Sequence, residues 1–196
     1  MLYYPAFFNL KGKRALLFGA GTVALRKAKS LVESGAQLSV ISLDFSAAFL
    51  RYAKSKKIKL KKSSKIPKQL NGISLVIAAT SNTTFNRSVY EVCKRKGIWI
   101  NVVDDPEHSS FIVPAVVRRG SLQIAISTGG ASPFLAKLLR RKFESELSVQ
   151  YAGLIRLLKK QRMKAKQTIS HSKDRRAYFY RLVKSKLKQL DNRKNR

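Results

Sequence analysis

The stretch "LLFGAGTVALRKAKSL", residues 16–31, decides how the first part of the chain folds. Residues 14–19 form a short apolar run that ends in a glycine, which predicts a buried strand. From Thr22 the apolar residues recur at helical spacing with Lys and Arg opposite them, which predicts a helix over 22–35 that ends at Gly35. A strand and a helix joined by so few residues predict a tight βα turn.

Three small residues in this turn fit the spacing G-x-G-x-x-(G/A): Gly19, Gly21 and Ala24. In a dinucleotide-binding turn the first glycine makes the sharp turn and the second lets the backbone approach a pyrophosphate. The small third residue lets the helix pack closely on the strand. The phosphates then bind at the helix N-terminus, where free N–H groups attract anions. The other reading is a tight turn with incidental glycines; the clear strand before it and helix after it favour the dinucleotide site.

The first half of the chain continues this alternation of strands and helices. Further strands are predicted at 36–42, 58–62, 73–80 and 98–104, with helices at 45–57 and 81–97. Regular alternation of this kind indicates a parallel sheet with right-handed crossovers. The expected fold class is therefore α/β, with an NAD(P)-binding, Rossmann-like parallel sheet.

The second half of the chain has a different pattern. Two β-rich runs around "RRGS" predict a hairpin within 110–128. The segment 132–148 predicts an amphipathic helix with Ser132 as N-cap and Pro133 at the first helical position. Residues 151–196 predict two more helices, which would form a small helical C-terminal domain.

Basic residues far outnumber acidic ones: 41 Lys and Arg against 10 Asp and Glu give a formal net charge of +31. Residues 151–196 alone hold 16 basic and 2 acidic residues. Such a surface can attract nucleic acid, serve a polyanionic small molecule or reflect the proteome of the host. Charge by itself does not choose among these three.

Cysteine and histidine are scarce. The single Cys93 excludes an internal disulfide and a cysteine-rich zinc cluster, and a reducing cytoplasm is the simplest location. His108 and His171 are far apart in the sequence, so we expect no resident metal site. No apolar run approaches the roughly 20 residues of a membrane helix, and the first residues lack the order of a signal peptide. We therefore expect a soluble protein without a membrane partner.

Four motifs together resemble the precorrin-2 dehydrogenase / sirohydrochlorin ferrochelatase family, the NAD-dependent enzymes of sirohaem synthesis. They are "YYPAFFNLKGKRALLFGAGTVALRKAKSLVESGA", "LVIAATSNTTFN", "NVVDDPEHSSFIVPA" and "ISTGGASPFLAKLLRRKFESEL". The match covers about residues 3–150. No methyltransferase domain follows, so the chain resembles the stand-alone form of the N-terminal part of sirohaem synthase.

The resemblance implies a Rossmann NAD-binding domain over 1–112, a dimerisation and substrate region over 113–150 and a helical basic region over 151–196. It implies NAD as cofactor, precorrin-2 as the tetrapyrrole substrate, sirohydrochlorin as product and a homodimer as the assembly. Some relatives also insert Fe²⁺, and the sequence leaves that step open. A positive surface would concentrate a substrate with many carboxylates, and no nucleic-acid partner is expected. The alternative is a non-catalytic sensor or carrier that binds NAD or a tetrapyrrole.

Asp104, in "NVVDDP" at the end of a predicted strand, aligns with the aspartate that the family uses in catalysis. This implies a general base that removes a macrocycle proton as hydride leaves. Read without the family, Asp104 and Asp105 form an Asp-Pro turn. Asp105 is expected to be the turn residue in either case.

The residues expected to bind the cofactor are Gly19, Gly21, Thr22, Val23, Leu43, Asp44, Thr80 and Asn101. Asp44 lies about 20 residues past the glycine turn, where a carboxylate holds the ribose of NAD. It comes slightly late for that role, so the choice between NAD and NADP stays open. Thr80 and Asn101 could equally be ordinary polar residues at strand ends.

A glycine-rich loop, "STGGASP", precedes the helix at 132–148. In the family this loop borders the macrocycle, so Thr128, Gly129 and Gly130 are expected to bind substrate. The alternative is a plain glycine-rich connection capped by Ser132.

Overall fold

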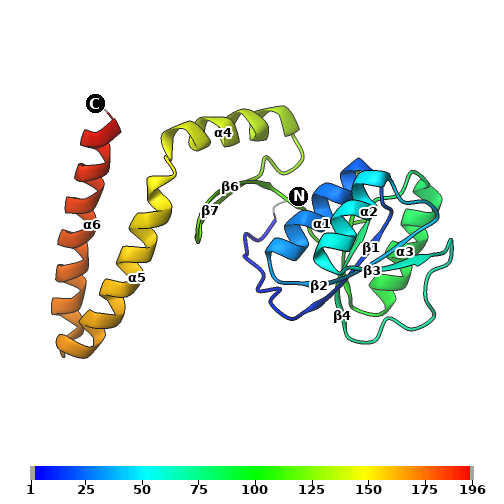
Figure 1. The fold of residues 1–196 in the computed structure, drawn as a ribbon. Coiled ribbons are helices and arrows are strands. Elements are labelled where there is room, and N and C mark those ends of the chain that lie inside the picture. The colour runs from blue at the N-terminus through cyan, green and yellow to red at the C-terminus, as the bar shows by residue number, and fades with distance from the viewer. Residues whose placement is uncertain (1–2, 195–196) are drawn as a thin grey trace. The chain divides into compact units, whose positions relative to one another are not determined.

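The computed structural model describes residues 3–194 of the 196-residue chain. The chain divides into two compact units, and the division falls between Val113 and Pro114. Figure 1 shows both units and labels most of their helices and strands. The further separation of 113–150 from 151–196 as distinct regions stays a prediction.

The first unit is built around a parallel sheet. Its strands are β1 (Arg14–Phe18), β2 (Gln37–Ser42), β3 (Lys59–Lys62), β4 (Ile73–Ala78) and β5 (Trp99–Val102). They lie in the order β3-β2-β1-β4-β5, and each neighbouring pair is parallel. The predicted strands and the α/β class are confirmed. The connections diverge on either side of β1, and open α/β sheets bind ligands beyond the carboxyl ends of the strands at such a point.

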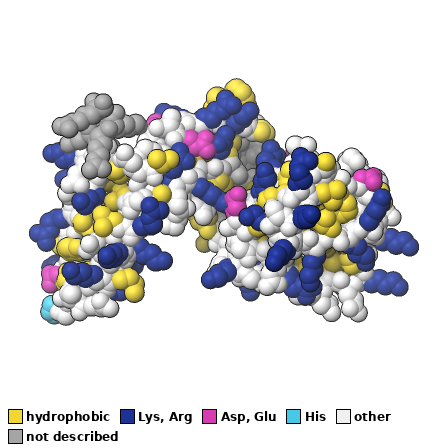
Figure 2. Space-filling model, viewed as in Figure 1, with side chains coloured by type: hydrophobic (Ala, Val, Ile, Leu, Met, Phe, Trp, Pro, Cys, Tyr) yellow, Lys and Arg dark blue, Asp and Glu magenta, His cyan; other side chains and the backbone are white. Residues whose placement is uncertain are grey.

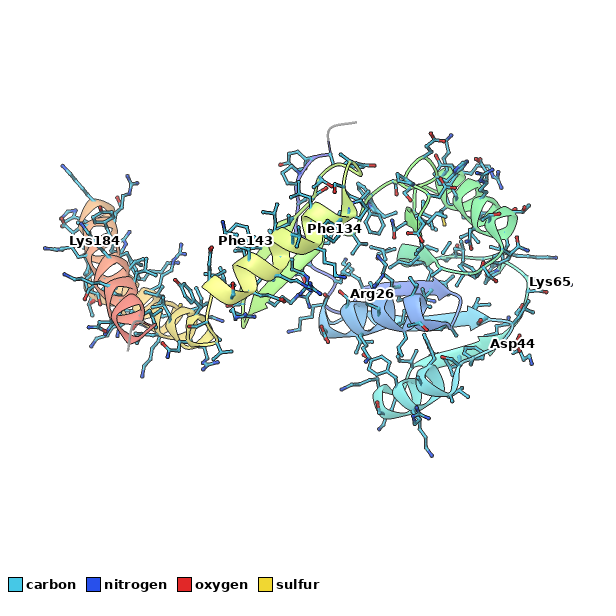
Figure 3. The ribbon with its side chains drawn as sticks, turned by 90° about the horizontal axis from the view of Figure 1, so that it is seen from above. Arg26, Asp44, Lys65, Phe134, Phe143 and Lys184 are labelled. Atoms are coloured by element: carbon cyan, nitrogen blue, oxygen red, sulfur yellow. The ribbon has the colours of Figure 1, made fainter. Side chains whose placement is uncertain are left out.

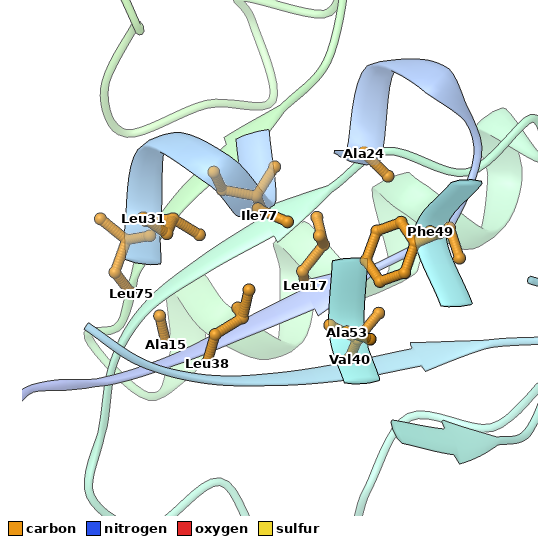
Figure 4. Close-up of a cluster of buried hydrophobic side chains, with 12 residues drawn as sticks. Ala15, Leu17, Ala24, Leu31, Leu38, Val40, Phe49, Ala53, Leu75 and Ile77 are labelled. Atoms are coloured by element: carbon orange, nitrogen blue, oxygen red, sulfur yellow. The ribbon is translucent and has the colours of Figure 1, made fainter. Parts of the chain in front are cut away.

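Three helices cover the faces of this sheet: α1 (Thr22–Glu33), α2 (Ala47–Lys56) and α3 (Thr83–Arg95). α1 and α2 lie on one face and α3 on the other (Figure 1). Along β1 the side chains alternate: Ala15 and Leu17 pack under α1 and α2, while Leu16 and Phe18 pack under α3. Figure 4 shows the first of these clusters, in which Phe49 of α2 is fully buried. Burial on both faces explains why β1 is a continuous apolar run.

The two edges of the sheet end differently. At one edge lies β3, with the sequence KLKK, and all of its residues are exposed. At the other, the N–H groups of Ile100 and Val102 in β5 donate to the hydroxyls of Ser110 and Ser109, at 2.7 and 2.9 Å. The Ser110 N–H donates to the Ile100 carbonyl at 2.8 Å. The segment that follows β5 therefore satisfies that strand's outer hydrogen-bonding groups.

The second unit combines a hairpin with helices. Its elements are β6 (Ala115–Arg119), β7 (Leu122–Ile126), α4 (Pro133–Glu146), α5 (Gln150–Thr168) and α6 (Ser172–Lys194). β6 and β7 pair antiparallel, as predicted, around a turn in which Gly120 has φ +63°. α4 begins as predicted: the Ser132 hydroxyl accepts the Leu135 N–H at 3.1 Å, and Pro133 is the first helical residue. The sequence patterns thus place every element of this unit.

The side chain of Arg119 joins the β6–β7 hairpin to α4. Nε and Nη2 of Arg119, at the end of β6, donate to the carbonyls of Leu147 and Glu144 at 2.6 and 2.7 Å. These bonds satisfy carbonyl groups at the C-terminal end of α4, where the helix itself leaves them unpaired. They fasten the hairpin to that helix.

α5 and α6 form an antiparallel helical hairpin, the α5–α6 hairpin (Figure 1). Nη1 of Arg175 donates to the carbonyls of Ile169 and Ser170, at 2.7 and 2.5 Å, and so closes the turn between the helices. The Tyr178 hydroxyl donates to Oε1 of Gln161 at 3.1 Å across the pair. In the described part of the chain, no helix is both long and apolar enough to span a bilayer.

Candidate active site

A cavity of about 710 Å³ lies in the first unit at the carboxyl ends of β1, β2 and β4. We call it the nucleotide cavity. Eight of the residues predicted for the site line it: Gly19, Gly21, Thr22, Val23, Leu43, Asp44, Thr80 and Asp104. Its volume falls in the range of roughly 300–1,000 Å³ that is usual for small-molecule and cofactor sites. The fold therefore brings seven of the eight expected cofactor residues to one place, together with the expected base.

Gly19 makes the sharp turn between β1 and α1. Its φ of +99° is outside the range that residues with side chains readily adopt. A Cβ on residue 19 would lie 2.4 Å from the carbonyl oxygen of Ala79, at the end of β4. Only glycine lets β1 and β4 end this close together. The first position of the predicted motif is thus required by the backbone itself.

Gly21 leaves the N-terminus of α1 open. It is the N-cap residue and makes no side-chain capping bond, whereas Ser46, Asn82 and Ser132 accept capping bonds on α2, α3 and α4. A Cβ at Gly21 would meet nothing within 4 Å. The first N–H groups of α1 consequently face the cavity without a capping side chain, and they can bind a pyrophosphate. Ala24, in the third motif position, is fully buried against the sheet.

The end of β2 supplies a carboxylate at the edge of the cavity. Asp44 follows this strand and is labelled in Figure 3; its side chain is 92% exposed. Its carboxylate lies 3.6 Å from Nζ of Lys62, at the end of the neighbouring β3. Ser42 donates its hydroxyl to the Asp44 carbonyl at 2.7 Å, which holds this turn. A carboxylate can accept bonds from ribose hydroxyls, while the adjacent lysine would favour an added phosphate, so both dinucleotides fit this edge chemically.

The end of β4 is held by a buried amide. Thr80 donates its hydroxyl to Oδ1 of Asn86 at 2.6 Å, and Nδ2 of Asn86 donates back to the Thr80 carbonyl at 3.0 Å. Asn86 is only 3% exposed, so its amide is shielded from water. The arrangement fixes Thr80 at the cavity wall.

Asp104 lines the same cavity from the loop after β5. It has φ +61°, the left-handed conformation that Asp adopts more readily than most side chains do. Lys27 of α1 is close enough to sense its charge: burial lowers the pKa of the Lys27 ammonium, Arg26 lowers it further, and Asp104 acts in the opposite direction. The Asp104 carboxylate and the N-terminus of α1 therefore line one cavity, and the Lys27 ammonium lies near that carboxylate.

Asp105 performs a different task from its neighbour. Its Oδ1 accepts the backbone N–H of His108 at 3.3 Å and lies 2.9 Å from Nδ1 of the same residue. Its Oδ2 accepts a bond from Nε of Arg87 at 3.5 Å. The side-chain bond with His108 is the main cause that holds the pKa of Asp105 below its usual value. These bonds are those of a turn residue, as predicted.

Asn101 does not line the nucleotide cavity. It is 7% exposed, and its Nδ2 donates to the Phe111 carbonyl at 3.1 Å. The amide is thus occupied in joining β5 to the segment that follows it. A contact between Asn101 and the cofactor stays a prediction.

The glycine loop belongs to the second unit. Oγ1 of Thr128 accepts the Ser132 N–H at 3.0 Å and donates to the Ser132 carbonyl at 3.1 Å. Gly129 and Gly130 have φ +62° and +91°, which suits glycine. Thr128 therefore shapes the entry to α4, and substrate binding by Thr128, Gly129 and Gly130 stays a prediction.

Several residues of the cavity wall are not among those predicted from the sequence. They are Ser63, Ser64, Asn82, Thr83, Phe85 and Asn86. The two serines follow β3 and the others follow β4, so each lies just past a carboxyl end of the sheet. Their position just past the strand ends could have indicated them, whereas their residue types do not distinguish them from ordinary loop and helix residues.

Metal-binding side chains do not gather in the described residues: no group of three or more His, Cys, Asp or Glu is placed to hold an ion. His108 pairs with Asp105, and its ring contacts Tyr90 edge-on at 5.3 Å. Cys93 is a buried free thiol in α3. The contacts of His108 and the burial of Cys93 are therefore those of residues that support the fold.

Comparison with known families and proteins agrees with this geometry. A family model described as "Putative NAD(P)-binding" matches residues 6–115, more than half of the chain. A second model, "Sirohaem biosynthesis protein central", matches residues 119–146. The resemblance inferred from the four motifs is thereby confirmed.

Two relatives are siroheme synthases. "Siroheme synthase 2" of Aeromonas salmonicida is 40% identical over 185 residues, which is 94% of this chain and 38% of the relative. "Siroheme synthase 2" of Klebsiella pneumoniae is 39% identical over 182 residues, 93% of this chain and 40% of the relative. The chain therefore spans about two fifths of the length of these curated relatives.

A solved structure shares the fold. "SirC, precorrin-2 dehydrogenase" aligns with a TM-score of 0.78 and 24% identity, covering 92% of this chain and 89% of that chain. The alignment extends over nearly the full length of both chains.

Proposed function

The chain belongs to the NAD(P)-binding family whose model covers residues 6–115, and we propose that it catalyses the NAD-dependent oxidation of precorrin-2 to sirohydrochlorin. The names of its relatives, siroheme synthase and precorrin-2 dehydrogenase, support this reaction. The observation that carries the proposal is the nucleotide cavity, which combines an open, glycine-lined helix N-terminus with the carboxylate of Asp104.

The cavity residues divide the work of cofactor binding. Gly19 allows the close approach of β1 and β4, and the N–H groups after Gly21 bind the pyrophosphate. Thr22 and Val23 line the phosphate end, while Leu43 and Asp44 border the adenosine ribose. Bound NAD supplies the hydride acceptor for the oxidation. The backbone of this chain fits that group because nothing blocks the space beside Gly21.

Asp104 is the proposed general base. Oxidation of precorrin-2 removes two hydrogens, one as hydride to the nicotinamide and one as a proton. A carboxylate at the end of β5 can accept that proton as the hydride leaves. The products are then sirohydrochlorin, NADH and a protonated Asp104, which releases its proton to water. Thr128, Gly129 and Gly130 are proposed to contact the substrate.

An anaerobic absorbance assay tests this reaction. Enzymatically generated precorrin-2 is mixed with NAD and the protein, with and without Fe²⁺. Formation of NADH together with the sirohydrochlorin spectrum supports the dehydrogenase. NAD binding without NADH formation would contradict it and favour a non-catalytic sensor or carrier. A further spectral change that depends on Fe²⁺ and exceeds the enzyme-free rate would add metal insertion, with iron as a substrate.

A homodimer is the proposed assembly. Phe134, Leu135 and Leu138 of α4 are 69%, 47% and 45% exposed, and they form an apolar patch near the start of that helix (Figure 3 labels Phe134). Apolar patches of this kind mark interaction surfaces. The test is sedimentation of the wild type beside Leu138→Glu, with Leu50→Glu on α2 as an equally exposed control. A monomeric wild type at micromolar concentration would contradict the dimer.

The proposed compartment is the cytoplasm. Cys93 is a buried free thiol, which is stable in a reducing environment. Fractionation of cells that carry a tagged chain, with a periplasmic and a cytoplasmic marker, tests this assignment.

A further inference from the structure

The α5–α6 hairpin carries a second cavity, of about 510 Å³. Its lining is Arg162 and Lys166 from α5 with Arg175, Arg176 and Phe179 from α6. Four cations thus converge on one hollow, and no acidic residue is part of its lining. We call it the basic cavity.

The geometry of the two helices brings these residues together. Arg162 and Lys166 are four residues apart and therefore share one face of α5. Phe179 is three residues after Arg176 and four after Arg175, so these three share one face of α6. The two faces line the same hollow.

The cations do not contribute equally to the fold. Arg175 closes the hairpin turn through its bonds to the carbonyls of Ile169 and Ser170. Arg162, Lys166 and Arg176 are exposed and have no ion pair or hydrogen bond through their side chains to any described residue. Three donors are therefore available to a ligand.

Repulsion among the basic side chains destabilises the α5–α6 hairpin when no anion is bound. Residues 150–190 hold thirteen basic residues and one acidic residue, Asp174. Like charges four residues apart on a helix destabilise it, and an anion between them removes the repulsion. Figure 2 shows Lys and Arg side chains over much of the visible surface of this hairpin.

We propose that the basic cavity binds carboxylate groups of a polycarboxylated, partly apolar ligand. Two guanidinium groups can each hold a carboxylate through a pair of parallel hydrogen bonds, and Lys166 adds a third charge. The ring of Phe179 offers an apolar surface to the hydrocarbon that carries those carboxylates. The concave shape suits the side arms of a compact ligand better than the evenly spaced phosphates of a duplex.

Naming the ligand rests on the proposed function. Precorrin-2 is an octacarboxylate macrocycle, so the basic cavity would be a contact for its acetate or propionate arms. The proposed carboxylate contact lies in the second unit and involves residues of that unit alone.

The test measures binding of uroporphyrin, a stable octacarboxylate porphyrin, by fluorescence titration in the absence of NAD. The cavity variant is Arg162→Gln with Arg176→Gln, which leaves the turn-closing Arg175 in place. The matched control is Lys164→Gln with Lys173→Gln, which removes two charges from the same helices outside the cavity lining. Circular dichroism verifies that both variants fold.

We expect the dissociation constant for uroporphyrin to rise at least about tenfold in the cavity variant and less than about twofold in the control. Equal losses in the two variants, or no loss in either, would overturn the proposal. The proposal would also be overturned if the cavity variant lost binding of a duplex DNA oligonucleotide but still bound uroporphyrin like the wild type.

A second readout separates this inference from the proposed reaction. If the chain oxidises precorrin-2, the cavity variant should raise KM for precorrin-2 while KM for NAD stays unchanged. If the chain shows no turnover but uroporphyrin binding still depends on Arg162 and Arg176, the cavity assignment stands and the dehydrogenase assignment fails.

Discussion

Gly19 and Ala79 lie so close that a methyl group on residue 19 would come within 2.4 Å of the Ala79 carbonyl oxygen. The contact joins the carboxyl end of β1, the central strand of the sheet, to that of its neighbour β4. Both residues line the nucleotide cavity.

Gly19→Ala should therefore destabilise the protein strongly. The energetic costs of the left-handed φ and of the steric overlap add to each other. We therefore expect the free energy of unfolding to fall by at least about 3 kcal/mol. Denaturant unfolding measures this loss. The control is Gly97→Ala, where φ is +64° but a Cβ meets nothing within 4 Å, so only the conformational cost of about 1 kcal/mol applies. Equal losses would show that the contact with Ala79 relaxes freely.

Gly21→Asp should abolish NAD binding while the protein stays folded. The new side chain enters open space, so the fold tolerates it, but its charge opposes the pyrophosphate at the N-terminus of α1. Calorimetric titration with NAD, beside Gly21→Ala for bulk alone, measures the effect. Unchanged affinity in Gly21→Asp would place the pyrophosphate elsewhere.

Asp104→Asn should lower kcat for precorrin-2 oxidation by about 100-fold or more, because it removes the proposed base. Asparagine tolerates the left-handed φ of this position, so folding and the dissociation constant for NAD should be unchanged. Steady-state kinetics and NAD titration measure both quantities. Asp44→Asn is the contrast: it should weaken NAD binding but leave kcat intact at saturating NAD. Full kcat in Asp104→Asn would exclude this carboxylate as the base.

The turn at Asp105 should make stability depend on pH. Its bond with His108, helped by Arg87, holds the pKa of this carboxyl below the usual value near 4. A lowered pKa contributes stability above the unfolded pKa, and that stability is lost as pH falls through the folded pKa. The difference in unfolding free energy between wild type and Asp105→Asn should thus be largest near neutral pH and shrink below about pH 4. A difference that does not change with pH would mean that the charge is irrelevant to the turn.

Cys93 should be chemically inert in the folded protein. Burial raises the pKa of its thiol to about 11. At pH 8 the folded thiol should react with a disulfide reagent at least about 100-fold more slowly than the same protein in guanidinium chloride. Rapid reaction of the folded protein would indicate that α3 opens readily.

Much of the first unit could be predicted from the sequence because β1 and β4 are continuous apolar runs between clear helices. The start of α4 at Ser132 and Pro133 could also be predicted, because helix capping depends on residues that are close in sequence. The glycine turn was predicted at the level of individual residues because each position has its own steric requirement.

Other features depend on contacts that are distant in sequence. Asn86 could not be foreseen in the cavity wall, because its bond to Thr80 depends on how α3 returns to the sheet. The bond from the Asn101 amide to the Phe111 carbonyl was not predicted either, and contact of Asn101 with the cofactor stays a prediction. The basic cavity depends on the pairing of α5 with α6, which the repetitive lysine pattern of these helices does not reveal.

The two edges of the parallel sheet bear on how the protein behaves in concentrated solution. An uncovered strand can recruit a strand from another molecule, which starts aggregation. Here Ser109 and Ser110 occupy the hydrogen-bonding groups of β5, and the lysines of β3 repel a second copy of the same edge. Neither side of the sheet therefore offers a template for edge-to-edge growth, so the sheet can stay at five strands even when the protein is crowded.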